Sequence, residues 1–309
     1  MIIMSFSVLM QKMLIFVVLM VIGYICARTG YISKAFVSDA SKITLNVFMV
    51  ATIINSVAAS DLALSSTELL TSIGVMSLTM LLLYASGSIL SRTLPMQNEK
   101  RPVFDLLISV VNTMFMGLPV VSQVYGGLAV FYVSLSCLPF NLLLYSYGVY
   151  RLNSSDSGFK FRWKSILCPP LIATVISILL FLFRLSLPLA AKDLLYVMSN
   201  VTMPLSMFVV GASLGSVRLI DSFTDKNSYV VAFFSLIVSP LLVWLILRGF
   251  VTDDILLKSA VILAGCPSGV VVTILSIQFG KDYVSSSKAI LLSTVLSVAT
   301  LPLVVYLLG

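Results

Sequence analysis

Residues 112–119 read NTMFMGLP and residues 265–269 read GCPSG, and both stretches lie inside long apolar segments. Each stretch combines glycine and proline with neutral polar side chains. Proline removes a backbone donor and clashes with the preceding helical turn, and glycine loosens the same region. We therefore expect both segments to be helices that break near their middle.

The position of these breaks matters because open backbone is costly in hydrocarbon. Pro267 lies twelve residues into the apolar segment that begins at residue 255, about 18 Å along a helix and thus near the middle of a bilayer. Open backbone is tolerated there only where it faces protein or a water-filled cavity. The N–H groups of the second half-helix would offer an anion a partial positive charge, and Pro267 suits its first position. The alternative is that these residues merely kink packed membrane helices.

Composition places nearly the whole chain in lipid. Apolar residues make up 59% of the 309 positions and charged residues only 10%, whereas soluble domains contain about 25% charged residues. The net charge of +7 is therefore assigned to basic loops and not to a nucleic-acid surface. A membrane helix needs roughly 20 mainly apolar residues. Ten segments qualify, namely 7–27, 37–58, 69–91, 103–122, 127–150, 165–183, 191–215, 229–249, 255–278 and 286–308.

Lysine and arginine are distributed unequally over the connections between these segments. Fourteen of the 19 fall on one side of the membrane and five on the other. Cytoplasmic loops are enriched in basic residues, so the first side is predicted to be cytoplasmic and both termini of this cell-membrane protein extracytoplasmic. Residues 151–164 form the main cytoplasmic connection between residues 1–150 and residues 165–309. Lys12, inside the first segment, is expected to snorkel to the outer surface.

The two halves of the chain resemble each other when the sequence is shifted by 154 residues. The shift superposes Asn46 on Asn200 and Gly126 on Gly280. Five spans per half is an odd number, so the two halves must have opposite orientations in the membrane. Inverted-topology repeats of this kind are common in secondary transporters. We therefore predict an all-α membrane protein of ten transmembrane helices in a five-plus-five inverted repeat.

Neutral polar residues near the two breaks offer hydrogen bonds to a ligand, although such residues also join neighbouring helices. Asn46 and Asn200 correspond under the repeat, and because asparagine is costly to bury we expect this pair to line a cavity. The predicted substrate-binding residues are Asn46, Asn112, Thr113, Gly117, Pro119, Asn200, Pro204, Cys266, Pro267, Ser268, Gly269, Thr273 and Gln278.

Several kinds of chemistry are missing from the sequence. Histidine is absent, which excludes a histidine-based metal site or proton shuttle. No span contains an acidic pair, so the usual zinc and aspartyl intramembrane enzyme sites are missing as well. We expect no enzymatic activity, no metal and no cofactor. The four cysteines lack CxxC spacing and are interpreted as small buried residues, namely Cys26, Cys137, Cys168 and Cys266.

In combination, these motifs resemble the auxin efflux carrier family. Residues 112–119 with Tyr125-Gly126 are similar to the fourth-helix motif of that family, and residues 266–269 and 278–282 to its ninth-helix motif. The resemblance implies a fold related to bile acid/sodium symporters, with helices 4 and 9 crossing at the transport site, at the midplane of the membrane. It also implies elevator-type alternating access and transport of a small organic anion such as malonate or an auxin-like acid. A homodimer is compatible with it. One departure is Val50, where the family commonly has a proline.

Acidic residues bear on how transport is driven. Asp105 lies two turns before Asn112, but we expect it to be a solvated residue at a cytoplasmic helix end, favoured there by the helix N-terminus. We therefore expect the carrier to move an anion with little or no proton coupling. Sodium coupling is an alternative, because carbonyls at broken helices coordinate Na⁺ in other transporters. A bile-acid-type sodium symporter, a channel and a membrane sensor are also compatible with the sequence.

Overall fold

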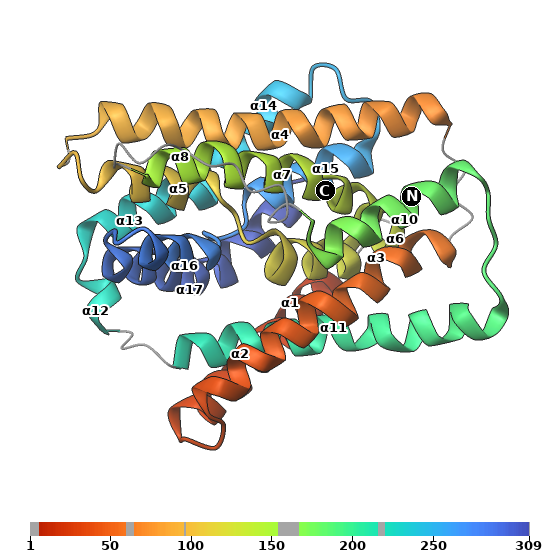
Figure 1. The fold of residues 1–309 in the computed structure, drawn as a ribbon, viewed down its shortest axis with the longest axis horizontal. Helices are drawn as coiled ribbons and strands as arrows, with labels where there is room; N and C mark the ends of the chain where they lie inside the picture. Colours follow the sequence, from red (N-terminus) through yellow and green to blue (C-terminus); the bar gives the residue numbers. More distant parts are fainter. Residues whose placement is uncertain (1–5, 60–64, 96, 154–166, 216–219, 309) are drawn as a thin grey trace.

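The computed structural model describes residues 6–59, 65–95, 97–153, 167–215 and 220–308, and Figure 1 shows its arrangement of helices. The regular secondary structure of these residues is helical, apart from one isolated bridge between Val111 and Ser268. The elements of the first half are α1 (Phe6–Arg28), α2 (Lys34–Ile43), η1 (Thr44–Phe48), α3 (Met49–Ala58), α4 (Ser66–Thr93), α5 (Arg101–Ser109), η2 (Thr113–Gly117), α6 (Leu118–Leu135), α7 (Cys137–Leu143), η3 (Leu144–Gly148) and α8 (Val149–Leu152). Those of the second half are α10 (Pro169–Leu182), α11 (Leu189–Gly215), α12 (Ile220–Phe223), α13 (Lys226–Phe233), η4 (Phe234–Val238), α14 (Ser239–Leu247), α15 (Asp254–Ala264), α16 (Val271–Gln278) and α17 (Tyr283–Leu307).

The predicted all-helical membrane character is confirmed. Six helical stretches in the described residues are long and apolar enough to cross a membrane, and two shorter apolar helices accompany them. The longest stretch, Thr113–Leu152, is divided at Gly126, whose φ of 75° is not helical. That division falls between the fourth and fifth predicted spans. Most of the predicted connection 151–164 lies outside the described residues.

The bounds of the helices follow the shift of 154 residues. Adding 154 to the limits of α4 gives 220–247, which is the range covered by α12 to α14. The same operation on α5 gives 255–263, which lies within α15. Gly126 and Gly280, also 154 residues apart, both have positive φ, at 75° and 62°. This agreement supports the internal repeat, and the opposite membrane orientation of the halves remains a prediction.

Two groups of helices make up the molecule. In the first, α1 packs along α11, and α3 packs on both α10 and α11. In the second, α4 packs on α5, α13 on α17, and α15 on α14 and α6. Figure 1 places α4 and α11 along opposite edges of the molecule. The two groups meet chiefly where α3 packs against α6.

Glycine lets α1 and α11 approach each other closely. A Cβ atom at Gly211 would overlap the backbone of Met20, and one at Gly23 would overlap the backbone of Phe208. Small residues at helix interfaces in membranes allow this kind of backbone approach, which gains packing where lipid supplies no hydrophobic drive. At these two glycines the backbones of α1 and α11 are in direct contact.

Candidate functional site

The two predicted breaks are present and meet each other. Helix α5 ends at Ser109 and η2 begins at Thr113, while α15 ends at Ala264 and α16 begins at Val271. The connecting segments run antiparallel, with the Asn112 N–H donating to the Pro267 carbonyl at 2.7 Å and the Gly269 N–H donating to the Val110 carbonyl at 2.7 Å. Backbone groups released by each break are thus satisfied by the other break. This pairing explains how two open helices are tolerated in apolar surroundings.

Pro267 does not occupy the position predicted for it. We expected it to open the second half-helix, but α16 begins four residues later, at Val271. Pro267 lies instead in the paired segment, where its carbonyl accepts from Asn112. An extended strand-like segment can use a residue that lacks an N–H donor, so the pairing of the two breaks outweighs the preference of proline for a helix start.

The two paired segments, residues 110–113 and 266–269, are called the crossing below. Small side chains make it compact. A Cβ at Gly117 would lie 3.0 Å from Leu263 and 3.3 Å from Cys266, and one at Gly269 would lie 3.3 Å from the Val110 backbone. The fully buried Ser268 hydroxyl donates to the carbonyl of Leu107 at 2.5 Å. That carbonyl belongs to the last turn of α5, which has no intrahelical partner. Ser268 therefore caps α5 from the opposite break.

Asn112 and Thr113 begin the second half of the first broken helix. The Asn112 side-chain oxygen accepts from the Phe115 N–H at 3.3 Å and caps η2. Its NH₂ group makes no hydrogen bond within the described part of the chain. Both residues are nearly buried, Asn112 at 7% and Thr113 at 3% exposure. Asn112 thus holds the break with the oxygen of its amide.

A polar cavity of about 250 Å³ lies beside this crossing, between α3, α11 and the first turns of α6. Across it, the Thr52 and Thr202 hydroxyls are 2.6 Å apart, and the Asn55 NH₂ donates to Ser199 at 3.2 Å. The Asn55 side-chain oxygen is buried and has no hydrogen-bond partner in the described residues. The lining carries no charged side chain and consists of Thr52, Asn55, Ser56, Ala59, Leu118, Pro119, Ser122, Gln123, Gly127, Val130, Tyr196, Ser199, Asn200, Thr202 and Met203.

The predicted residues divide between the crossing, the cavity and other places. Asn112, Thr113, Gly117 and residues 266–269 lie at the crossing, and Pro119 and Asn200 line the cavity. Asn46 and Pro204 are exposed, and α11 continues through Pro204 without a break. Thr273 and Gln278 are also outside the cavity. The Thr273 hydroxyl is 2.9 Å from that of Ser286, and Gln278 is exposed at the end of α16.

Sequence reasoning missed most of the cavity lining. Thr52, Asn55 and Ser56 lie three and four residues apart on α3, and Ser199 and Thr202 repeat this spacing on α11. Residues at such spacing share one face of a helix. A search for neutral polar stripes in the second and seventh apolar segments would have found them.

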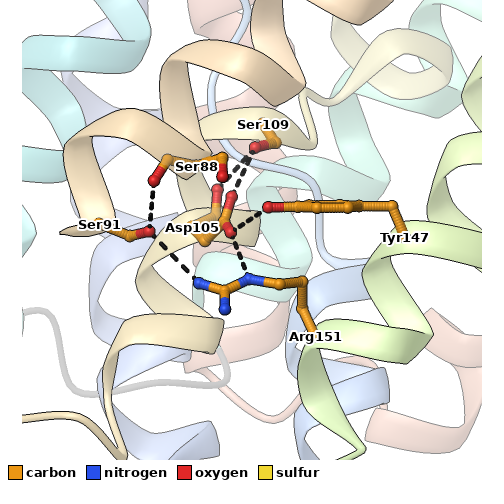
Figure 2. Close-up of polar contacts among 6 residues, drawn as sticks. All are labelled: Ser88, Ser91, Asp105, Ser109, Tyr147 and Arg151. Carbon is orange, nitrogen blue, oxygen red and sulfur yellow. Dashed lines mark hydrogen bonds and ion pairs between the residues drawn. The ribbon is translucent and has the colours of Figure 1, made fainter.

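Asp105 is placed very differently from the solvated helix end that we predicted. It is fully buried and accepts from Arg151 Nε at 2.7 Å, from the Tyr147 hydroxyl at 2.6 Å and from the Ser109 hydroxyl at 3.1 Å. Figure 2 shows these side chains converging from α4, α5, η3 and α8, with Arg151 also reaching Ser91. Buried charges need a partner of opposite sign, and Arg151 supplies it from 46 residues away. The cluster holds the first half of the broken helix against its neighbours.

Lys258, one of the five basic residues on the side predicted to be extracytoplasmic, is buried near the start of α15. It is 7% exposed and pairs with Asp254 at 2.8 Å on the first turns of α15. The neighbouring Asp253 caps α15 and accepts from the Tyr132 hydroxyl at 2.6 Å. These contacts tie α15 to α6 away from the cavity. No group of three or more potential metal ligands occurs within the described ranges.

The chain is similar in sequence to known families and proteins. A family model described as a membrane transport protein matches residues 8–305. An uncharacterized transporter of Methanothermobacter thermautotrophicus is 26% identical over 303 residues, which cover 95% of this chain and 96% of that protein. A putative malonate transporter of Rhizobium meliloti is 31% identical over 121 residues, which cover 39% of this chain and 37% of that protein.

Proposed function

Because the chain belongs to the membrane transport protein family, the family of the auxin efflux carriers that its motifs resemble, we propose that it is a secondary active carrier for a small carboxylate. It is a multi-pass membrane protein, and its substrate is a small molecule. The observation that carries the finer proposal is the polar cavity beside two broken, paired helices. Broken helices next to a cavity are how many carriers build a substrate site within the membrane.

The cavity favours a short carboxylate over a larger anion. Pockets for drug-sized ligands occupy about 300–1,000 Å³, and this cavity is smaller, at about 250 Å³. A bile acid is therefore a poorer fit than a compact dicarboxylate. The partial similarity to a protein named as a putative malonate transporter supports the same class.

Neutral donors can hold such an anion without a basic residue in the cavity. Asn55, Gln123 and Asn200 line the space with side-chain amides, and Ser122 lines it with a hydroxyl. Carboxylate oxygens accept hydrogen bonds from neutral N–H and O–H groups, and the N-terminal end of η2 and α6 adds a partial positive charge.

Transport requires the site to open alternately to the two sides of the membrane. We propose that α1–α3, α10 and α11 form a scaffold and that α4–α8 and α12–α17 form a transport body moving as an elevator. The division follows the packing groups of the fold. Ten spans in an inverted repeat, both termini outside the cell membrane, and a homodimer complete the proposal.

The driving force is proposed to be the membrane potential. The cavity lining contains no carboxylate that could carry a proton, and Asp105 is held by Arg151 and Tyr147. A potential that is negative inside drives an anion outward by about 2.3 kcal/mol per charge per 100 mV. Sodium symport remains the alternative, since the cavity offers neutral oxygens to a cation.

The test compares two asparagines that correspond under the repeat. Purified wild-type protein, Asn200→Ala and Asn46→Ala are scanned for thermal stability with malonate, succinate, indole-3-acetate and a bile acid, with and without Na⁺. Malonate is expected to stabilise the wild type by mass action, about 2.7 kcal/mol at a hundredfold excess over its Kd. Asn200→Ala should weaken binding about tenfold, the effect of losing about 1.4 kcal/mol. Asn46→Ala, outside the cavity, should bind as the wild type does.

Uptake into proteoliposomes separates the alternatives. Flux that follows an imposed potential without Na⁺ supports uniport, and stabilisation that needs Na⁺ moves the mechanism to symport. Uptake driven by a proton gradient alone contradicts the uncoupled mechanism. If no carboxylate stabilises the wild type, the organic-anion proposal fails.

A further inference from the structure

Two of the four cysteines meet although they are 31 residues apart in the chain. Cys137 is the first residue of α7 and is 1% exposed, and Cys168 is the N-cap residue of α10. The Cys168 side chain packs against the small buried cluster that contains Cys137. Leu171 and Met114 pack around them, so the pair adjoins η2 at the crossing. All four cysteines are free thiols.

Hydrogen-bond donors and a helix N-terminus surround the Cys168 sulfur. The NH₂ group of Asn141 donates to the Cys168 sulfur at 3.5 Å and to the Cys137 carbonyl at 2.8 Å. Cys168 also stands at the N-terminus of a 14-residue helix, where the helix dipole stabilises negative charge. Cys266 differs in this respect, because its own thiol donates to the Ile262 carbonyl at 3.4 Å. The Cys168 sulfur therefore accepts a hydrogen bond, whereas the Cys266 thiol donates one.

We propose that Cys168 and Cys137 are a peroxide-sensitive thiol pair, a modification site whose closure to a disulfide arrests the carrier. In the first step the Cys168 thiolate attacks hydrogen peroxide, so that an S–O bond forms, the O–O bond breaks and hydroxide leaves. The sulfur is oxidised by two electrons to a sulfenic acid and the peroxide is reduced.

In the second step Cys137 attacks the oxidised sulfur of Cys168. An S–S bond forms, the S–O bond breaks, and the departing hydroxide takes the proton of the Cys137 thiol. Two thiols and one peroxide thus give one disulfide and two molecules of water. An external thiol reductant reverses the step by thiol–disulfide exchange.

The bridge would join helices that belong to different packing groups. Helix α10 packs mainly on α3, whereas α7 packs with α4 and η3. This part of the inference rests on the proposed function, in which these two groups move relative to each other. A covalent bond between them beside Met114 would hold the two bodies in one arrangement, and conformational steps of this kind set the rate of transport cycles.

The experiment uses the full chain in proteoliposomes and compares wild type with Cys168→Ser and Cys26→Ser. Each sample is treated with hydrogen peroxide, its free thiols are alkylated, and the digest is searched by mass spectrometry for a peptide joining Cys137 to Cys168. Malonate flux is measured before oxidation, after it, and after dithiothreitol. Gel filtration confirms that each variant is folded.

Wild type and Cys26→Ser are expected to form the joined peptide, to lose flux about tenfold or more, and to recover with dithiothreitol. Cys168→Ser should keep its flux in peroxide. Absence of the joined peptide in the wild type overturns the proposal, as does a joined peptide without any change in flux. Equal peroxide sensitivity of Cys168→Ser also overturns it. If the reduced protein moves no carboxylate, the proposed function fails, whereas the joined peptide still decides whether the thiol pair exists.

Discussion

At the scale of single residues, Asp105 illustrates how a buried charge can organise a membrane helix. Its carboxylate lies within hydrogen-bonding distance of Arg151, Tyr147 and Ser109. Burying a charge is costly, and the cost is offset only when a partner and further hydrogen bonds surround it. The cluster therefore fixes the first half of the broken helix, about two turns before the crossing, and is assigned a positioning role.

Asp105→Asn should destabilise the protein strongly because it leaves the Arg151 guanidinium without its counter-ion. Removing one partner of a buried pair costs about 3–5 kcal/mol, and the double variant Asp105→Asn/Arg151→Gln should cost less than the sum of the single changes. Asp39→Asn is the control, because Asp39 pairs with Lys42 on the surface, with both side chains 68% exposed. The free energy of unfolding in detergent is measured for Asp105→Asn, Arg151→Gln, the double variant and Asp39→Asn. An equal, small effect of Asp105→Asn and Asp39→Asn contradicts the assigned role.

At the scale of elements, α4 and α5 meet where a glycine removes a side chain. A Cβ at Gly87 would overlap the Ser109 hydroxyl and approach the Asp105 backbone, whereas a Cβ at Gly74, on the same helix, would meet nothing within 4 Å. The contact lies directly over the Asp105 cluster. The distance between the two helices and the geometry of the buried ion pair are therefore set together.

Gly87→Ala should destabilise the protein by about 1–3 kcal/mol, the usual cost of overpacking a tight site. Gly74→Ala should be neutral or slightly stabilising, because alanine favours a helix over glycine by up to about 1 kcal/mol. Thermal unfolding of the two purified variants makes the comparison within one helix. Equal thermal unfolding midpoints for Gly87→Ala and Gly74→Ala would show that α4 can move away from α5 at little cost in stability.

Much of the element level could be predicted from the sequence. The predicted segments 69–91 and 191–215 correspond to α4 and α11. Residues 69–91 and 194–215 carry no charge, and a mainly apolar stretch of about twenty residues is stable in lipid only as a helix or in a closed barrel. The contacts between elements could not be predicted. Nothing in the chain near Asp105 indicates a partner 46 residues away, and the pairing that displaces Pro267 from the start of α16 depends on the other break.

The candidate site was predictable at the crossing and poorly predictable in the cavity. The unusual grouping of glycine, proline and asparagine pointed to residues 112–119 and 265–269. The cavity depends on which faces of α3 and α11 meet α6, and this is decided by packing. Asn55 and Asn200 lie in the cavity lining as a result, whereas Asn46 is exposed outside it.

At the scale of the whole molecule, the proposed topology rests on the basic residues of the loops. Fourteen of 19 lie on the side assigned to the cytoplasm, and ten spans return the chain to the side on which it began. The proposed scaffold and transport body are each assembled from both halves of the sequence. Opposite orientation of the halves is what would allow the same packing to open to either side.

A reporter fused after the last residue should therefore lie outside the cytoplasm. Alkaline phosphatase at that position should be active in a bacterial host and green fluorescent protein should be dark, because each folds on one side only. Insertion within residues 151–164 should give the reverse pattern. A fluorescent C-terminal fusion would require an odd number of spans or the opposite orientation.

The turns at Gly126 and Gly280 have a consequence for the handedness of the chain. Both residues have positive φ, and a Cβ built on either one would meet nothing within 4 Å. The obstacle to a side chain there is stereochemical, about 1–2 kcal/mol for an L-residue, and has nothing to do with space. D-Alanine, the mirror image of the residue excluded on these grounds, has the backbone preference that each turn requires. A semisynthetic chain carrying D-alanine at these two positions should fold as the glycine chain does. The two halves therefore share a requirement for positive φ at the same position of the repeat.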